Sequence, residues 1–369
     1  MEYLRPFQAN PDSSFLTYYA LGSDKQYTLT TLTRGQFLDK ALRLASYLTS
    51  LGVTKDVRVT HYFSSNSLHD LVLRLASAFL GSVGVTVNWS SDTASTVSYK
   101  VTKSDSKVLF CDGNVDQTML SAVHRTCPAV PVCDLSTVDL TEYEPLPTTT
   151  LSTSTPAQTR IVIFTSGTTG DPKGVELSYH NYATNAATFE QFLLPSNTTP
   201  LLVVVNPMHH TNSTSMTDWA MRNADAELHL FAGYSTLYWK HAAEIQEKAR
   251  PNQKQIMPLV SRHFDFLKSL ASEQKLPVPQ SVLTAALSKC VLLLGSAPVG
   301  PTTVDTIQEL CGTLPTVRFG STETTLQVRQ EEGREGREER REWREERREW
   351  RDELVERRDE RPKTRHERP

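Results

Sequence analysis

The spacing of apolar residues in the first third of the chain predicts helices that alternate with strands. A capping-box pattern at Thr33 and Gln36 begins a helix that is expected to end at Gly52. Short apolar runs at 57–63, 84–87 and 107–111 are typical of strands, and residues 68–80 have the apolar content of a buried helix. Strands separated by helices predict a parallel sheet with helices on both faces.

The alternation resumes after a Ser/Thr/Pro-rich stretch at 136–159, which has no periodicity and is expected to be an exposed linker. Strands are predicted at 161–164, 201–205, 227–231 and 290–294. Helices are predicted from about residue 179 and at 237–248, 259–270 and 303–311. The whole pattern predicts the α/β fold class, with mainly parallel sheets flanked by helices.

The composition changes abruptly after Val328 to a tract of arginine and glutamate. Residues 329–369 hold 15 basic and 15 acidic side chains, so the net charge of −3 belongs to the first 328 residues, and the tract is no polycation for nucleic acid. The heptad Arg-Glu-Glu-Arg-Arg-Glu-Trp occurs twice in succession at 337–350. Three explanations stay open: an artefact of the gene model by intron read-through or frameshift, a solvated charged helix, and an interaction module.

Cysteine spacing and hydropathy favour an intracellular, cytoplasmic setting. The five cysteines show no Cys-x-x-Cys spacing, so neither a zinc site nor a disulfide framework is expected. The first ten residues lack the apolar segment of a secretory signal. The apolar region at 71–87 is interrupted by Arg74, Gly81 and Gly84, so we expect a buried helix and a short strand there and no membrane span.

A loop rich in glycine and threonine directly follows the predicted strand at 161–164. Its glycines let the backbone approach an anion closely, its hydroxyls add donors, and its lysine supplies a charge, as a loop that holds the phosphates of ATP requires. It differs from a Walker A loop because glycine, and not serine or threonine, follows the lysine. The candidate nucleotide-binding residues in this loop are Thr165, Ser166, Gly167, Thr168, Thr169, Gly170 and Lys173.

A second motif lies at 317–323, where an aromatic residue and a glycine precede Thr322 and Glu323. The ring of Phe319 offers a flat face for adenine, and Gly320 leaves room for the nucleotide. Thr322 can donate a hydrogen bond to phosphate, and the carboxylate of Glu323 suits Mg²⁺.

Two shorter segments complete the candidate site. His210 follows the predicted strand at 201–205, and it is either a functional histidine or a satisfied histidine at the end of that strand. The small residues Gly295, Ser296 and Ala297 follow the predicted strand at 290–294, where they would let a ligand lie against the backbone. A simple turn into the next helix is the alternative for this second segment.

Together these segments resemble the motifs of the adenylate-forming enzymes, namely acyl-CoA synthetases, adenylation domains of peptide synthetases and luciferases. The resemblance covers roughly residues 30–328. It implies the large N-terminal domain of these enzymes, incomplete at its C-terminal end, and a site that uses ATP, Mg²⁺, a carboxylic acid and CoA as acceptor. It also implies catalytic roles for Lys173, His210, Thr322 and Glu323, with Glu323 as the metal ligand. His209 and Ser213 depart from the aromatic residue and the glycine of the family pattern.

The expected organisation is a lead-in at 1–30, an α/β subdomain at 31–135, the linker at 136–159, an AMP-binding region at 160–328 and the charged tail at 329–369. The expected function is ATP-dependent activation of a carboxylic acid to an acyl-adenylate, followed by thioester formation with CoA. No position matches the family's ribose-binding aspartate or the lysine of its small C-terminal domain, so a truncated nucleotide-binding fragment without turnover is the alternative. A third hypothesis is a scaffold whose tail recruits a partner. The sequence does not reveal which acid is bound.

Overall fold

The computed structural model describes residues 2–165, 170–296, 299–325 and 327–328, which belong to one compact unit. The strands of this described part form two sheets, one of eight strands and one of six. In order across it, the larger sheet contains β14 (Gln327–Val328), β13 (Thr316–Phe319), β12 (Val291–Leu294), β11 (Gln253–Leu259), β9 (Thr199–Val204), β10 (Glu227–Phe231), β1 (Ser14–Leu21) and β2 (Tyr27–Thr33). The smaller sheet contains β6 (Val132–Asp134), β5 (Val108–Cys111), β3 (Arg58–His61), β4 (Val83–Thr86), β7 (Thr159–Thr165) and β8 (Lys173–Ser178).

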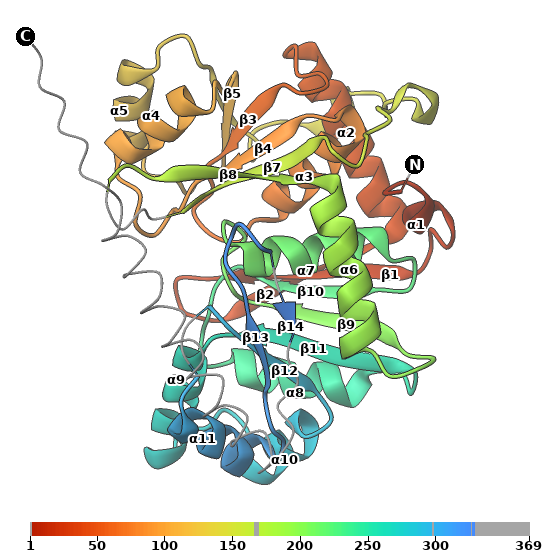
Figure 1. Cartoon of the computed structure of the whole chain (residues 1–369), viewed down its shortest axis with the longest axis vertical. Coiled ribbons are helices and arrows are strands. Elements are labelled where there is room, and N and C mark those ends of the chain that lie inside the picture. Colours follow the sequence, from red (N-terminus) through yellow and green to blue (C-terminus); the bar gives the residue numbers. More distant parts are fainter. Residues whose placement is uncertain (1, 166–169, 297–298, 326, 329–369) are drawn as a thin grey trace, which may run out of the picture. The chain divides into compact units, whose positions relative to one another are not determined.

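Both sheets are mainly parallel; the edge strands β2, β14 and β8 run antiparallel to their neighbours, whereas β6, at the other edge of the smaller sheet, is parallel to β5. The antiparallel pairs are β1 with β2, β13 with β14, and β7 with β8. The helices are α1 (Arg5–Gln8), α2 (Arg34–Ser50), α3 (Leu68–Leu80), α4 (Ala94–Lys103), α5 (Gln117–Thr126), α6 (Tyr179–Leu193), α7 (Thr211–Arg222), α8 (Tyr238–Lys248), α9 (Ser261–Ser272), α10 (Gln280–Leu287) and α11 (Pro301–Cys311), with short 3-10 turns at Leu140–Glu142 and Thr148–Thr150. Figure 1 shows α9, α10 and α11 grouped beside β12 and β13. The predicted α/β class is confirmed.

The central strands of the larger sheet are buried on both faces, as their apolar sequences predicted. Along β9, Leu202 and Val204 pack into a core with α3 and α7, whereas Leu201 and Val203 pack into a second core with α8, α9 and α10. Because neighbouring residues of a strand point to opposite faces, this division places a helical layer on each side of the sheet.

The first long helix begins as its capping pattern predicted. The Thr33 hydroxyl accepts the Gln36 backbone N–H at 3.2 Å, and the Gln36 side chain accepts the Thr33 N–H at 2.9 Å. Gly52 follows the helix with φ +79°, a backbone region that favours glycine. The helix α3 spans the predicted residues 68–80 without change.

The segment 136–159, expected to be an exposed linker, is fastened to the helices beside it. The backbone N–H of Leu146 donates to the Leu42 carbonyl of α2, and that of Ser152 donates to the Phe79 carbonyl of α3 at 2.7 Å. Leu151 between them is buried. These contacts were not predicted, because they depend on acceptors far away in the sequence.

Two further features concern the expected setting of the chain. No described helix combines the length and the apolar composition that a membrane crossing requires. All five cysteines are free thiols, and four of them are buried: Cys111, Cys127, Cys290 and Cys311.

Candidate functional site

A pocket of about 540 Å³ lies where several parallel strands of the larger sheet have their C-terminal ends. The strands β9, β11, β12 and β13 are parallel, so their carboxyl ends meet there, which is where open α/β sheets bind ligands. The lining residues lie at or after the ends of these strands: Asn206, Pro207, His210, Thr211, Asn212, Val260, His263, Ser296, Arg318, Phe319, Gly320, Ser321 and Thr322. A different pocket, of about 410 Å³, is lined by parts of α3, α6 and residues 151–156 and contains none of the predicted site residues.

Three of the four predicted segments therefore meet in one pocket. It is lined by His210, Ser296, Phe319, Gly320 and Thr322. The first and the last of these residues are more than 100 positions apart in the sequence. Their chemical roles stay predictions.

The side chain of Arg318 packs against the turn after β12. Gly295 precedes Ser296, and a Cβ at Gly295 would lie 2.6 Å from Cγ of Arg318. Glycine is thus required here for a close approach of side chain to backbone. Ala297, predicted in the same turn, lies outside the described residues.

The motif at 317–323 presents its aromatic ring to solvent at the end of β13. Phe319 is 61% exposed, so a face of its ring is accessible to a ligand. A hydrogen bond from its own backbone N–H, followed by one from Ser321, lowers the pKa of Glu323, so this carboxylate is ionised at neutral pH. Glu323 is exposed and follows Thr322 directly, but it is not among the pocket-lining residues.

The predicted phosphate loop connects two antiparallel strands, a hairpin that was not predicted. Thr165 ends β7 and Lys173 begins β8, and the two residues lie opposite each other in the pairing. Ser166, Gly167, Thr168 and Thr169 lie outside the described residues. Gly170 and Lys173 are exposed, and neither they nor Thr165 line the pocket described above.

Close packing between β8 and β7 accounts for the glycine that follows Lys173. A Cβ at Gly174 would lie 3.0 Å from the Val162 side chain and 3.2 Å from the ring of Phe164 on β7. A larger residue would require the side chains of Val162 and Phe164 to shift.

The loop that leads to His210 is held by Asn66, which the sequence analysis missed. The Asn66 side-chain N–H groups donate toward the carbonyl oxygens of Phe231 at 2.9 Å and Asn206 at 3.0 Å, and its Oδ1 accepts the Met208 N–H at 2.7 Å. Asn66 is 1% exposed, so these bonds are shielded from water. Its position just before a predicted helix gave no signal of this role.

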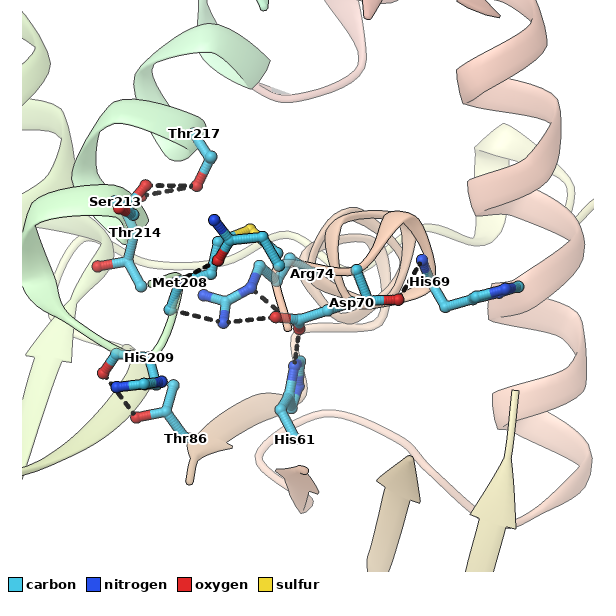
Figure 2. A network of polar contacts seen from close by, with 12 residues as sticks. His61, His69, Asp70, Arg74, Thr86, Met208, His209, Ser213, Thr214 and Thr217 are labelled. Atoms are coloured by element: carbon cyan, nitrogen blue, oxygen red, sulfur yellow. Dashed lines mark hydrogen bonds and ion pairs between the residues drawn. The ribbon is translucent and has the colours of Figure 1, made fainter. Parts of the chain in front are cut away.

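A buried ion-pair cluster on α3 holds the same loop (Figure 2). The Arg74 guanidinium donates to both Asp70 carboxylate oxygens, at 3.1 and 3.0 Å, and to the Met208 carbonyl at 3.0 Å. On the other side of the carboxylate, Nδ1 of His61 lies 2.7 Å from Asp70 Oδ1. Burial raises the pKa of Asp70, but the charge of Arg74 and the hydrogen bonds with His61 and Arg74 outweigh it, so the net shift is downward.

His209, which stands where the family pattern has an aromatic residue, packs as one. Its ring centroid lies 4.2 Å from that of Trp89 and 4.3 Å from that of His210. Neither ring nitrogen has a hydrogen-bond partner among the described residues. Burial, followed by the charges of His210 and Lys100, lowers the pKa of His209 to about 2, so the ring is neutral.

Ser213, which replaces the family glycine, has a packing role of its own. It is fully buried in α7, and its hydroxyl donates to the Asn206 carbonyl at 2.6 Å. His210 directly precedes this helix. Desolvation, followed by the charge of Lys100, lowers the pKa of the His210 ring, which favours the neutral imidazole at neutral pH.

The fold is similar to that of several solved structures. The apo form of MatB from Rhodopseudomonas palustris matches with a TM-score of 0.69 and 18% identity, over 90% of this chain and 62% of that one. The inhibitor-bound N-terminal domain of FACL13 from Mycobacterium tuberculosis matches with a TM-score of 0.70 and 20% identity, over 89% of this chain and 77% of that one. O-succinylbenzoate Coenzyme A Synthetase (MenE) from Bacillus subtilis, in complex with AMP, matches with a TM-score of 0.65 and 19% identity, over 88% of this chain and 74% of that one.

This chain thus spans less than two thirds of the length of MatB. No curated protein matches its sequence. At the level of the family, however, the match is extensive, because the pattern of the family described as AMP-binding enzyme fits residues 6–347. With most of its length matched in this way, the chain belongs to the AMP-binding enzyme family.

Proposed function

We propose that this chain activates a carboxylic acid with ATP to form an acyl-adenylate, and that the acyl group then passes to the thiol of CoA. The observation that carries the proposal is a pocket at the C-terminal ends of parallel strands of the larger sheet. Five predicted site residues line it together: His210, Ser296, Phe319, Gly320 and Thr322. Two similar structures support the nucleotide, since MatB has been solved with bound ATP and MenE with AMP. The name of MenE, a Coenzyme A Synthetase, supports the acceptor.

In the proposed reaction, an oxygen of the acid attacks the α-phosphorus of ATP, and the bond to the leaving pyrophosphate breaks. The thiolate of CoA next attacks the acyl carbon, and AMP leaves. Both steps bring anions together, so catalysis depends mainly on positioning and on fixed donors that offset negative charge.

The described residues fit the parts of ATP. The exposed ring of Phe319 provides a face for adenine, with Gly320 beside it. Thr322 would donate to a phosphate oxygen, while the hairpin residues Thr165 and Lys173 flank the loop assigned to the β- and γ-phosphates. Ser166, Gly167, Thr168, Thr169 and Gly170 complete that assignment.

A single carboxylate suffices for the expected metal. Mg²⁺ commonly binds one or two protein carboxylates together with phosphate oxygens and water, and Glu323 is an ionised, exposed carboxylate beside the site. Among the described residues there is no group of three or more His, Cys, Asp or Glu side chains that could hold a metal alone. Bound with ATP, Mg²⁺ would offset charge on the phosphates.

Acid-dependent exchange of labelled pyrophosphate into ATP tests the proposal. Exchange requires formation and reversal of the acyl-adenylate, so we expect label in ATP only when a suitable acid is added. ATP binding without exchange for any acid in a broad panel would contradict the proposed turnover and favour a nucleotide-binding function.

Replacing Phe319 with alanine is expected to raise the KM for ATP by about 5- to 150-fold, because stacking of a base on an aromatic ring contributes about 1–3 kcal/mol. The matched control is Phe192→Ala on α6, since Phe192 is 59% exposed and Phe319 is 61% exposed. Initial exchange rates over an ATP titration measure the effect. An equal change in both variants would mean that Phe319 does not contact adenine.

A further inference from the structure

The side chain of Arg318 is buried in the pocket wall, and no described residue provides a partner for its charge. Arg318 lies on β13 and is 4% exposed, and it lines the pocket of the proposed acid-activating site. Its Nε, Nη1 and Nη2 atoms make no hydrogen bond to any described residue. A Cβ at Gly295 would lie 2.7 Å from its Nε, so the glycine makes room for this side chain.

Three other buried arginines of the described chain pair with a carboxylate, and buried Arg34 donates to the carbonyls of Pro6 and Ala226. Arg74 pairs with Asp70 at 3.0 Å, Arg160 lies 3.5 Å from Asp218, and Arg222 also pairs with Asp218. A buried charge without a partner is costly, and folded proteins satisfy such groups or use them for a ligand. Arg318 is therefore a group that an incoming anion would complete.

The pocket itself supplies no counter-charge. None of its lining residues is Asp or Glu. Burial lowers the pKa of Arg318 to about 9, so the guanidinium remains protonated at neutral pH. Burial lowers the pKa of His263 to about 4, which leaves this lining histidine neutral. The pocket thus carries positive charge at Arg318.

Two neutral donors of the same pocket also lack partners in the part of the chain that the structure describes. Asn212 is 3% exposed and Thr211 is 7% exposed, and both lie in the first turn of α7. The Asn212 amide and the Thr211 hydroxyl make no hydrogen bond to a described residue. An unpaired cation with unpaired amide and hydroxyl groups suits a ligand with oxygen acceptors.

Arg318 lines the same pocket as the residues assigned to ATP, but its side chain and the ring assigned to adenine lie on different sides of β13. Successive side chains of a strand point to opposite faces, so Arg318 and Phe319 leave β13 on different sides. Phe319 presents its exposed face to adenine in the proposed function, and the described residues flanking the phosphate loop, Thr165, Gly170 and Lys173, do not line the pocket. The anion that reaches Arg318 is consequently assigned to the acid.

We propose that the acid activated by this chain is a dicarboxylic acid, and that Arg318 binds the carboxylate that does not react. This inference rests on the proposed function, since it names the substrate class of the same site. A guanidinium can bind a carboxylate through two parallel hydrogen bonds, and a site built for such a group rejects an analogue that lacks it.

Binding to the full chain without nucleotide provides the first test. Glutarate is expected to raise the Tm by about 3–5 °C at about 100 times its Kd, whereas pentanoate, of equal carbon number, leaves the Tm nearly unchanged. Arg318→Met keeps a long side chain without charge and is expected to abolish the shift. The control Arg262→Met removes an exposed charge on α9 and is expected to retain it.

Unliganded protein distinguishes a binding role from a structural one. Because Arg318→Met removes an unpaired buried charge, we expect the variant to melt at or above the temperature of the unchanged protein. A lower Tm of unliganded Arg318→Met, combined with an unchanged glutarate shift, would overturn the proposal.

Pyrophosphate exchange provides the second test. The ratio of kcat/KM for glutarate to that for pentanoate is expected to fall by about 100-fold or more in Arg318→Met. An equal loss for both acids would assign Arg318 to the reacting carboxylate or the nucleotide and overturn the proposal. Exchange with monocarboxylic acids alone would also overturn it while supporting the proposed function. Arg318-dependent binding of glutarate without exchange for any acid would contradict the proposed function and support the carboxylate site.

Discussion

Replacing Glu323 with glutamine is expected to lower the rate of acid-dependent pyrophosphate exchange by about 10²–10³-fold, as for loss of one group that stabilises transition-state charge. The substitution keeps the size of the side chain and removes the charge that would hold Mg²⁺. Glu323 is exposed and ionised, so the change disturbs no packed neighbour. Exchange rates measured over a Mg²⁺ titration are expected to reach saturation only at higher Mg²⁺ concentration.

The control for this prediction is Glu309→Gln, which removes an exposed carboxylate on α11. It is expected to leave both the exchange rate and the Mg²⁺ dependence unchanged. If Glu323→Gln slows exchange with an unaltered Mg²⁺ dependence, Glu323 is not a metal ligand.

The second large effect concerns folding stability and the buried cluster of Figure 2. Asp70→Ala is expected to lower the free energy of unfolding by about 3–5 kcal/mol, because it leaves the charge of Arg74 buried without its partner. Both side chains are at most 4% exposed. Urea denaturation of the full chain measures the loss.

The chain offers a matched pair as control. Asp39 and Arg43 on α2 have the same i,i+4 spacing as Asp70 and Arg74 on α3, but the Asp39 side chain is 49% exposed. Asp39→Ala is expected to leave the free energy of unfolding nearly unchanged, since exposed ion pairs contribute little. Similar losses in the two variants would show that burial does not determine how much an ion pair contributes to the free energy of unfolding.

The effect of Asp70 also has a defined pH dependence. Its pKa is lower in the folded chain than in the unfolded chain, so its stabilisation is fully present above the unfolded value of about 3.9 and is lost as the pH falls through the folded value. The difference in unfolding free energy between the unchanged protein and Asp70→Ala is therefore expected to be constant from neutral pH down to about pH 4 and to shrink below it.

Elements with strong local signals were predicted well from the sequence. The helix α3 has an apolar face, a serine cap and a glycine after its last residue, and its predicted bounds are confirmed. In contrast, β8 was missed because this edge strand is polar and mostly exposed, so it lacks the apolar run of a buried strand. The helix α7 was missed because most of its residues are polar although they are buried, so its sequence lacks the apolar content of a buried helix.

The residues of the candidate site were also predicted only in part. His210 and Phe319 were proposed from short motifs, and the structure brings them to one pocket. The roles of Asn66 and Arg74 depend on contacts with the carbonyls of residues 205–208, about 140 positions later. No local pattern carries such information. Arg318 was overlooked within a recognised motif, because only the structure reveals that it is buried and that no described residue pairs with it.

The place of β1 in the larger sheet has a consequence for synthesis of the chain. Its parallel neighbour is β10, and the side chains of Tyr19 on β1 and His229 on β10, which are hydrogen-bonded, are separated by 210 positions. At about 5–20 residues per second, β1 would leave the ribosome roughly 10–40 s before its partner is made. During that interval the edge of β1 that later pairs with β10 is open to pairing with other chains, so a chaperone that shields the nascent N-terminus would increase the yield of folded protein.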